Sequence, residues 1–343
     1  MSLKKIAGFP EQDSAVGFYR IVQPLRFMKR EGIVQEARTI PFTGESQTQH
    51  YNWSDKTFME ICSGADVYFT TLLWKQADIL RALNLREHYG LKWIVDLDDN
   101  IWASHKDNPA NDQAEVLRKN REMCLSLCDG VVVSVPNLKE LVERLNPNVF
   151  VQPNGLDMKI WNPLKVKNKR KIRIGWRGAY GHKEDLELIE PIIKKIKENY
   201  PKVEFVTFGY KPEFSDENMT WTSCMKYPAK LAELGIDIAV VPLIDSAFNR
   251  CKSNLGWLEW SALNIPVVYS PTENQKDLPG IAAKTSFEWY EALSSLIEDT
   301  KLRKELASRQ NLYLKTKYDM KNLVYPLAEW MEKLPRRKDV KPE

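Results

Sequence analysis

Residues 237–270 hold the side chains whose types and spacing most clearly point to chemistry. The run Ile236–Leu243, which is apolar except for Asp237, is typical of a strand covered on both faces. Polar side chains follow it: Asp245, Asn249 and Arg250. Lys252 and Ser253 then stand at the predicted start of a helix that runs to about Leu263. Because serine is a favoured N-cap and exposed amides at a helix N-terminus bind anions, this segment predicts an anion site to which Lys252 adds a charge.

Glu259 follows Lys252 by close to two helical turns, so the predicted helix would place both residues on one face. A ligand along that face could place phosphates at Lys252 and a ribose diol at the Glu259 carboxylate, which accepts two hydrogen bonds. The alternative is that Lys252 is a solvated loop cation and that Glu259 pairs with a nearby base. Since glutamate is rarely buried without a partner and apolar residues surround this one, we favour a binding role.

A second candidate is the turn that follows the predicted strand Lys171–Trp176. This turn and the start of the next helix carry Arg177, Gly178, His182 and Lys183. The glycine spacing does not match the dinucleotide fingerprint, and a flexible turn is the plain alternative. Arg177 could form a bidentate phosphate contact, and His182 could cap the helix or donate to phosphate. We rank Arg177 above His182 as an anion ligand, and both below Lys252.

Three aspartates, Asp96, Asp98 and Asp99, cluster at the end of the predicted strand Lys92–Asp98. Clustered carboxylates are costly unless a positive charge is near. Four roles are open: a clamp on sugar hydroxyls, a base for an acceptor hydroxyl, a divalent metal site, and a helix cap at Asp99. We take Asp98 and Asp99 as candidate catalytic residues.

The elements that must position these residues are short apolar runs alternating with amphipathic stretches. Strands are predicted at Lys4–Phe9, Ala65–Leu72, Lys92–Asp98, Gly130–Val135, Val149–Gln152, Lys171–Trp176, Val203–Gly209, Ile236–Leu243 and Pro266–Ser270. Helices are predicted at Val16–Arg30, Lys75–Tyr89, Ala114–Ser126, Pro136–Leu145 and Asp185–Tyr200, kinked at Pro191, with two or three more in Thr285–Leu334. This alternation predicts an α/β protein with two Rossmann-like, doubly wound domains facing a cleft, whose ligands bind at the carboxyl ends of the strands.

Composition sets further limits on function. The 343 residues carry 50 Lys+Arg and 46 Asp+Glu, and a net charge of +4 lacks the basic excess of a dedicated nucleic-acid binder. The five cysteines are scattered and form no zinc-site pattern, so we expect reduced, structural thiols. The apolar run at the start is too short for a signal peptide, and no run approaches ~18 apolar residues. We therefore expect a cytoplasmic protein, with peripheral contact with a membrane as the alternative.

The segment 237–270 resembles the nucleotide-sugar motif of the family 4 glycosyltransferases and related GT-B enzymes. In that family a glutamate that precedes an ALNIP-like element contacts the nucleotide ribose, and Glu259 matches it. The family's second glutamate, near the transferred sugar, is replaced here by Cys251. The chain resembles instead a branch with an FN-x-x-KS pattern, in which the lysine would take the diphosphate. The matching residues are Phe248, Asn249, Lys252 and Ser253.

The resemblance covers about 16–270 and extends to two further segments. The start of the first helix holds Gly17, Tyr19 and Arg20, and in GT-B enzymes this loop reaches over the donor or the acceptor. The alternative there is a helix-start glycine with a core tyrosine. The segment 151–163 is similar to the family's PNG-x-D element, where we expect a turn at Asn154–Gly155 and a hinge contact from Asp157.

The resemblance implies a domain plan and a set of site residues. Residues 1–163 would form the acceptor-side domain, 164–310 the nucleotide-sugar domain, and 311–343 helices that could pack back on the first domain. The catalytic candidates are Lys252, Arg177, Asp98 and Asp99, and the donor-binding candidates are Gly17, Arg20, Gly178, His182, Lys183, Asn249, Ser253, Asn254, Leu255 and Glu259.

The function that follows from the resemblance is transfer of a sugar from a nucleoside-diphosphate sugar, with retention at the anomeric carbon and without a metal or a further cofactor. The acceptor is open among glycans, lipid-linked sugars, proteins and modified nucleic acids. Two alternatives remain: a nucleotide-sugar epimerase of GT-B architecture, and a nucleotide- or sugar-binding protein without catalysis.

Overall fold

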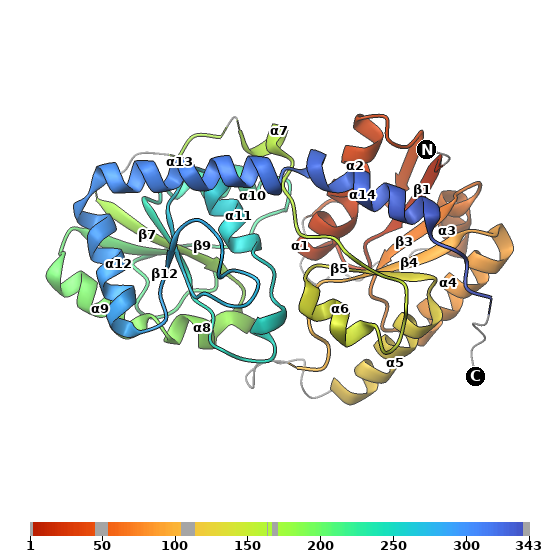
Figure 1. Ribbon diagram of the computed structural model, residues 1–343, viewed down its shortest axis with the longest axis horizontal. Coiled ribbons are helices and arrows are strands. Elements are labelled where there is room, and N and C mark those ends of the chain that lie inside the picture. Colours follow the sequence, from red (N-terminus) through yellow and green to blue (C-terminus); the bar gives the residue numbers. More distant parts are fainter. Residues whose placement is uncertain (1–2, 45–53, 104–113, 163, 167–170, 339–343) are drawn as a thin grey trace. The chain divides into compact units, whose positions relative to one another are not determined.

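The computed structural model describes residues 3–44, 54–103, 114–162, 164–166 and 171–338. The chain forms two compact units (Figure 1). Unit 1 comprises Met1–Gly155, Cys251–Ser253 and Met320–Glu343, and unit 2 comprises Leu156–Arg250 and Asn254–Asp319. The first boundary therefore falls several residues before the predicted limit at 163, and residues 163 and 167–170 of the predicted linker lie outside the described residues.

Unit 1 is built on a six-stranded parallel sheet with the order β2-β1-β3-β4-β5-β6. The strands are β1 (Lys5–Phe9), β2 (Glu36–Thr39), β3 (Val67–Thr71), β4 (Lys92–Leu97), β5 (Gly130–Val133) and β6 (Val149–Val151). The helices are α1 (Ala15–Gly17), the π-helix η1 (Phe18–Val22), α2 (Gln23–Arg30), α3 (Asp55–Cys62), α4 (Gln76–Tyr89), α5 (Ala114–Leu127), α6 (Pro136–Val142) and α14 (Met320–Lys333). The strand order reverses between β1 and β3, which makes the sheet doubly wound.

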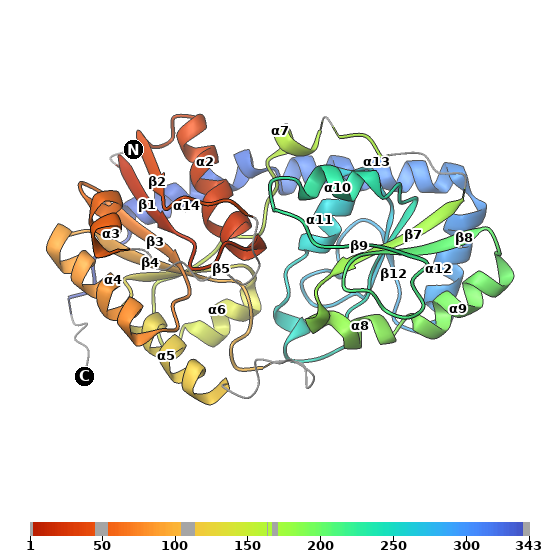
Figure 2. The same cartoon turned by 180° about the vertical axis from the view of Figure 1, so that it is seen from behind.

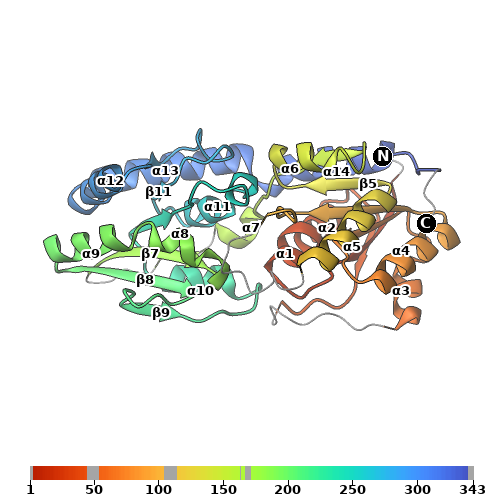
Figure 3. The same ribbon diagram turned by 90° about the horizontal axis from the view of Figure 1, so that it is seen from below.

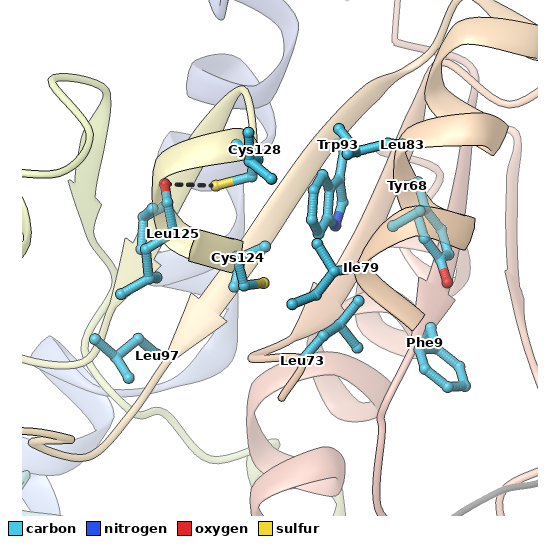
Figure 4. Close-up of a cluster of buried hydrophobic side chains, with 14 of the residues drawn as sticks. Phe9, Tyr68, Leu73, Ile79, Leu83, Trp93, Leu97, Cys124, Leu125 and Cys128 are labelled. Atoms are coloured by element: carbon cyan, nitrogen blue, oxygen red, sulfur yellow. Dashed lines mark hydrogen bonds between the residues drawn. The ribbon is translucent and has the colours of Figure 1, made fainter. Parts of the chain in front are cut away.

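Both faces of the unit 1 sheet are covered, as its continuous apolar strands predict. Successive residues of β4 face opposite sides: Trp93 belongs to one buried cluster, and Ile94 to another. Figure 4 shows the first cluster, where Cys124 and Cys128 lie among leucine, isoleucine and aromatic side chains. Burial raises the pKa of Cys124 to about 12, and all five cysteines are free thiols.

Helix α14 packs on unit 1, beside β5 in Figure 3. Its apolar side chains join the second cluster, and Trp330 and Leu334 lie so close to Gly130 that a side chain at that position would collide with them.

Unit 2 holds a second six-stranded parallel sheet, with the order β12-β11-β10-β7-β8-β9. The strands are β7 (Ile172–Gly178), β8 (Val203–Gly209), β9 (Glu217–Met219), β10 (Ile238–Val241), β11 (Val267–Tyr269) and β12 (Ile281–Ala282). The helical elements are α7 (Met158–Trp161), η3 (Tyr180–His182), α8 (Lys183–Glu187), α9 (Glu190–Asn199), α10 (Tyr227–Glu233), η4 (Asn249–Cys251), α11 (Leu255–Ala262), α12 (Ser286–Glu298) and α13 (Thr300–Lys317). Counted from β7, this is the 3-2-1-4-5-6 order of a dinucleotide-binding sheet, and its order reverses between β7 and β10.

One predicted helix of unit 2 is two helices. The predicted stretch Asp185–Tyr200 breaks between α8 and α9, and Pro191 lies in the first turn of α9. A proline is tolerated there because the missing N–H has no partner in the first turn of a helix. Helix α9 packs beside α12, as Figure 2 shows, and both contribute to the core of unit 2. Within the described ranges of the two units, no helix is both long and apolar enough to cross a bilayer.

Candidate functional site

Arg177, which lies at the carboxyl end of β7, is held by a buried carboxylate. Its Nε lies 2.6 Å from Oε2 of Glu259 on α11. The Glu259 residue is only 1% exposed. The hydroxyl of Tyr227 on α10 donates to the same oxygen at 2.9 Å. Burial and the neighbouring Glu259 raise the pKa of Tyr227 well above its usual value, so it stays a protonated donor. The guanidinium is therefore fixed at the edge of the sheet where parallel α/β sheets bind ligands.

Two predicted donor ligands, Arg177 and Glu259, thus bind each other within unit 2. The pairing matches the alternative in which Glu259 meets a nearby base. Its physical cause is burial, because a carboxylate removed from water needs a cation or hydrogen-bond donors. In this structure Glu259 binds Arg177, and a direct contact of Glu259 with a ribose stays a prediction.

The predicted start of α11 is wrong. The helix begins at Leu255 with Asn254 as its N-cap residue, and the Ser253 hydroxyl accepts a hydrogen bond from Nδ2 of Asn154 at 2.7 Å. Residues Cys251–Ser253 belong to unit 1, where Cys251 is part of the first buried cluster. These contacts hold the segment outside the helix, so the expectation that Lys252 and Glu259 share one helical face does not apply.

Lys252 forms an ion pair within unit 1. Its Nζ lies 2.8 and 3.0 Å from the two carboxylate oxygens of Asp99, in the loop after β4. The adjacent residues are also in contact, since Nδ2 of Asn100 lies 3.6 Å from Sγ of Cys251. Two catalytic candidates from opposite halves of the sequence therefore meet at the carboxyl edge of the unit 1 sheet.

The three clustered aspartates occupy three different environments. Asp96 is buried and bound by Arg20, while Asp99 pairs with Lys252. Asp98 is half-buried, and no residue that the structure describes donates a hydrogen bond to its carboxylate. Burial, with repulsion from Asp99 and Asp96, raises the pKa of Asp98 to about 7, although Lys252 and Arg20 oppose the shift. A carboxylate with that pKa can exchange a proton near neutral pH.

Arg20 is bound within the interior of unit 1. It is 4% exposed, and its guanidinium donates to both oxygens of Asp96 at 2.8–3.1 Å, to the carbonyl of Gln152 at 2.7 Å and to Oδ1 of Asn154 at 3.0 Å. These bonds form because a buried guanidinium must satisfy its N–H groups within the protein, and a donor contact by Arg20 stays a prediction. Gly17 occupies a tightly packed position, since a Cβ there would lie 2.4 Å from the carbonyl oxygen of Gln12.

We expect Arg20→Met to destabilise unit 1 by roughly 3–5 kcal/mol, because Asp96 would remain as a buried charge without its partner. Arg30→Met is the matched control, since Arg30 pairs with Glu31 on the surface and such pairs contribute about 0–1 kcal/mol. Urea unfolding followed by tryptophan fluorescence measures both changes. Equal losses for the two variants would contradict the structural role of Arg20.

The remaining candidates follow β7 and β10 in unit 2. Nδ1 of His182 lies 2.8 Å from Oδ2 of Asp185, and Nζ of Lys183 lies 3.5 Å from Glu187. Gly178 packs under the Trp176 ring, which a Cβ would approach to 2.5 Å. Asn249 is fully buried and donates to Asp185 and to the carbonyl of Ile244.

The sequence patterns did not point to Asp185 or Tyr227. Asp185 had a usable signal, because an acidic residue three positions after a histidine at a helix start can reach the imidazole. Tyr227 had none, since it comes from a separate helix and meets Glu259 only through packing. Among the residues described, no group of three His, Cys, Asp or Glu side chains is arranged to hold a metal ion.

The chain matches no family model and no curated protein, but it matches solved structures. One is a mutant of TarM from S. aureus in complex with fondaparinux, alpha-GlcNAc-glycerol and UDP, at 10% identity and a TM-score of 0.56, with 81% of this chain and 58% of that chain covered. Another is a UDP-forming trehalose-phosphate synthase from Burkholderia xenovorans, at 11% identity, a TM-score of 0.58, and 82% and 76% coverage. A third is the pneumococcal O-GlcNAc transferase GtfA with UDP and GlcNAc, at 9% identity, a TM-score of 0.53, and 82% and 59% coverage.

These matches establish the class of fold. Two Rossmann-like units, each with a parallel six-stranded sheet, form the GT-B architecture that the matched glycosyltransferases share. The predicted α/β class and GT-B fold are confirmed. The chain spans less than two thirds of the length of the TarM and GtfA structures, and at identities near 10% the likeness concerns the fold alone.

Proposed function

We propose that this chain is a glycosyltransferase that moves a sugar from a nucleoside-diphosphate sugar to an acceptor, with retention at the anomeric carbon. The observation that carries the proposal is Arg177, a cation fixed by buried Glu259 at the reversal point of the unit 2 strand order. Open α/β sheets bind ligands at that point, outside the carboxyl ends of the strands. The fold adds support, because structures of this architecture contain UDP.

Catalysis in this proposal comes from stabilising the leaving diphosphate. When the bond between the anomeric carbon and the phosphate oxygen breaks, its electron pair moves to the diphosphate, and a cation held in place beforehand stabilises that charge. Glu259 fixes Arg177 at Nε, and the terminal N–H groups of a guanidinium have the geometry for a bidentate phosphate contact. We propose Lys252 as the second cation, as the FN-x-x-KS resemblance implies.

The acceptor hydroxyl must lose a proton as its oxygen bonds to the anomeric carbon, and for retention this bond forms on the face from which the diphosphate leaves. We propose Asp98 as the group that takes this proton, because its pKa of about 7 leaves a useful fraction of carboxylate at neutral pH. Asp98 lies at the carboxyl edge of the unit 1 sheet, the unit that the family resemblance gives to the acceptor.

Arg177→Lys is expected to weaken the binding of a nucleoside diphosphate about tenfold, because lysine keeps the charge but loses the bidentate geometry. Arg173→Lys is the matched control: Arg173 lies on the same strand, but its guanidinium binds Glu204, Glu217 and the carbonyl of Leu234. A thermal-shift screen of nucleoside diphosphates and their sugars identifies the ligand, and calorimetry then gives the Kd of each variant. An unchanged Kd in Arg177→Lys would contradict the assignment.

Incubation with the bound nucleotide-sugar alone separates the proposal from its alternatives. A transferase hydrolyses the donor slowly or leaves it intact, and it turns over when the acceptor is added. Conversion of the donor to its epimer would replace the proposal with epimerase activity. Failure of every nucleoside diphosphate to shift the melting temperature would overturn donor binding altogether.

A further inference from the structure

Asp185 is a fully buried carboxylate whose two oxygens have different partners. Oδ1 accepts hydrogen bonds from the backbone N–H of Ile244 at 2.9 Å and from Nδ2 of Asn249 at 2.7 Å. Oδ2 lies 2.8 Å from Nδ1 of His182. One oxygen therefore holds the loop that follows β10, and the other holds the imidazole that follows β7.

The contact at Oδ2 determines which ring nitrogen of His182 carries a proton. A carboxylate only accepts hydrogen bonds, so the imidazole nitrogen that faces it must carry the proton. Nδ1–H therefore points to Asp185, and the ring is turned so that Nε2 faces away from that carboxylate. Buried carboxylates that bind one imidazole nitrogen set the orientation and charge of the ring in this way in other sites.

The location of the pair gives it a function. Strands β7 and β10 are neighbours, and the strand order of unit 2 reverses between them. His182 comes from the turn after β7, shortly after Arg177 and Gly178, while Ile244 and Asn249 come from the loop after β10. Asp185 joins these two segments at the point where a sheet of this topology receives phosphate groups. The His182 side chain remains 29% exposed there.

We propose that Asp185 is a positioning residue that holds His182 so that its Nε2–H donates to the diphosphate of the nucleotide-sugar. This inference rests on the proposed function and adds a residue to the same site. Asp185 touches neither the sugar nor the phosphates. It acts by fixing the imidazole and by compensating the positive charge of the doubly protonated ring as negative charge develops on the leaving diphosphate.

Asp185→Asn is expected to lower turnover about 10–100-fold, since partners behind a functional side chain typically contribute that much. The amide oxygen of the new asparagine can still accept the hydrogen bonds that the loop donates to Asp185. If Asp185 served only to hold this loop, turnover would therefore change little. Ser246→Ala is the control for that loop, because the Ser246 hydroxyl accepts from the backbone N–H of Asn249 without touching Asp185. We expect turnover close to wild type in Ser246→Ala.

The decisive measurement is a double-mutant cycle of His182→Ala and Asp185→Asn. If Asp185 acts through His182, the double variant turns over as fast as His182→Ala alone. If Asp185→Asn lowers turnover by the same factor with and without His182, the positioning role is overturned.

A second measurement does not depend on activity, and so separates failure of this inference from failure of the proposed function. The chain has only four histidines, which makes the ring nitrogens of His182 assignable by ¹⁵N NMR. We expect a proton on Nδ1 in the wild type and loss of that preference in Asp185→Asn. A neutral His182 protonated only at Nε2 in the wild type would overturn the inference even if the enzyme transfers sugar. The expected spectra without nucleotide binding would support the pair and overturn the donor proposal alone.

Discussion

Replacing Lys252 with alanine is expected to lower turnover of the nucleotide-sugar by about 10²–10³, the usual effect of removing one preorganised charge stabiliser from a transition state. The fold should survive, because Lys252 and Asp99 are 18% and 43% exposed and such pairs contribute about 0–1 kcal/mol. Steady-state kinetics with the donor found in the thermal-shift screen gives the first quantity, and urea unfolding gives the second.

Arg250→Ala is the matched control for this prediction. Arg250 lies two positions before Lys252 and also pairs with an aspartate, but Arg250 and Asp245 are 62% and 77% exposed. If a general positive potential in this segment were enough, both variants would lose activity alike. A near-normal rate in Lys252→Ala, or equal losses in the two variants, would refute the role of Lys252 at the diphosphate.

The fold was predictable where the chain is covered on both faces. Strands such as β5 and β10 are apolar throughout, since helices pack on either side, and a run of that kind is visible in the sequence. The strands β2 and β9 were missed for the opposite reason. Both lie at the edge of a sheet and are half-exposed, with the polar sequences EART and ENM, so no apolar run marks them.

Rules based on neighbouring residues failed where tertiary contacts determine the start of a helix. Ser253 has the chemistry of an N-cap, yet Asn154 binds its hydroxyl and Cys251 enters the core of unit 1. The helix therefore begins later, at Leu255. No rule about neighbouring residues contains Asn154, so sequence pattern alone could not place the start of α11.

The candidate site was likewise predictable from local sequence only in part. The residue types were found, because Arg177, Lys252 and the aspartates lie at the ends of predicted strands or after them. Their pairing was not, because Arg177–Glu259 and Arg20–Asp96 join residues far apart in the sequence. That Glu259 pairs with a nearby base was the alternative we did not favour, and which base it meets depends on how α11 packs against β7.

Asp98→Asn is expected to lower turnover by about 10²–10⁴, the range for loss of a general base. Burial and the neighbouring carboxylates raise the pKa of Asp98 from 3.8 to about 7, so wild-type kcat/KM should rise with pH and level off above about 7. The variant should lose that limb of the pH profile. Asp55→Asn is the control, because Asp55 is an exposed carboxylate of unit 1 paired with Arg81, and it should leave the profile unchanged.

The same shift makes a prediction about stability, with a definite sign. Between about pH 4 and 7 the folded protein holds a proton on Asp98 that the unfolded chain has released, because the folded pKa is the higher one. The unfolded state therefore binds fewer protons, and the contribution of Asp98 to stability falls as pH rises through this window. Asn has no proton to lose, so Asp98→Asn should be more stable than the wild type at about pH 8, on the order of 1 kcal/mol after solvent screening, and equal to it near pH 4. Urea unfolding at the two pH values tests this directly. A variant that is less stable than the wild type at the higher pH would mean that the ionised carboxylate is well compensated in the folded protein. Asp98 would then lack the raised pKa on which its role as a base depends.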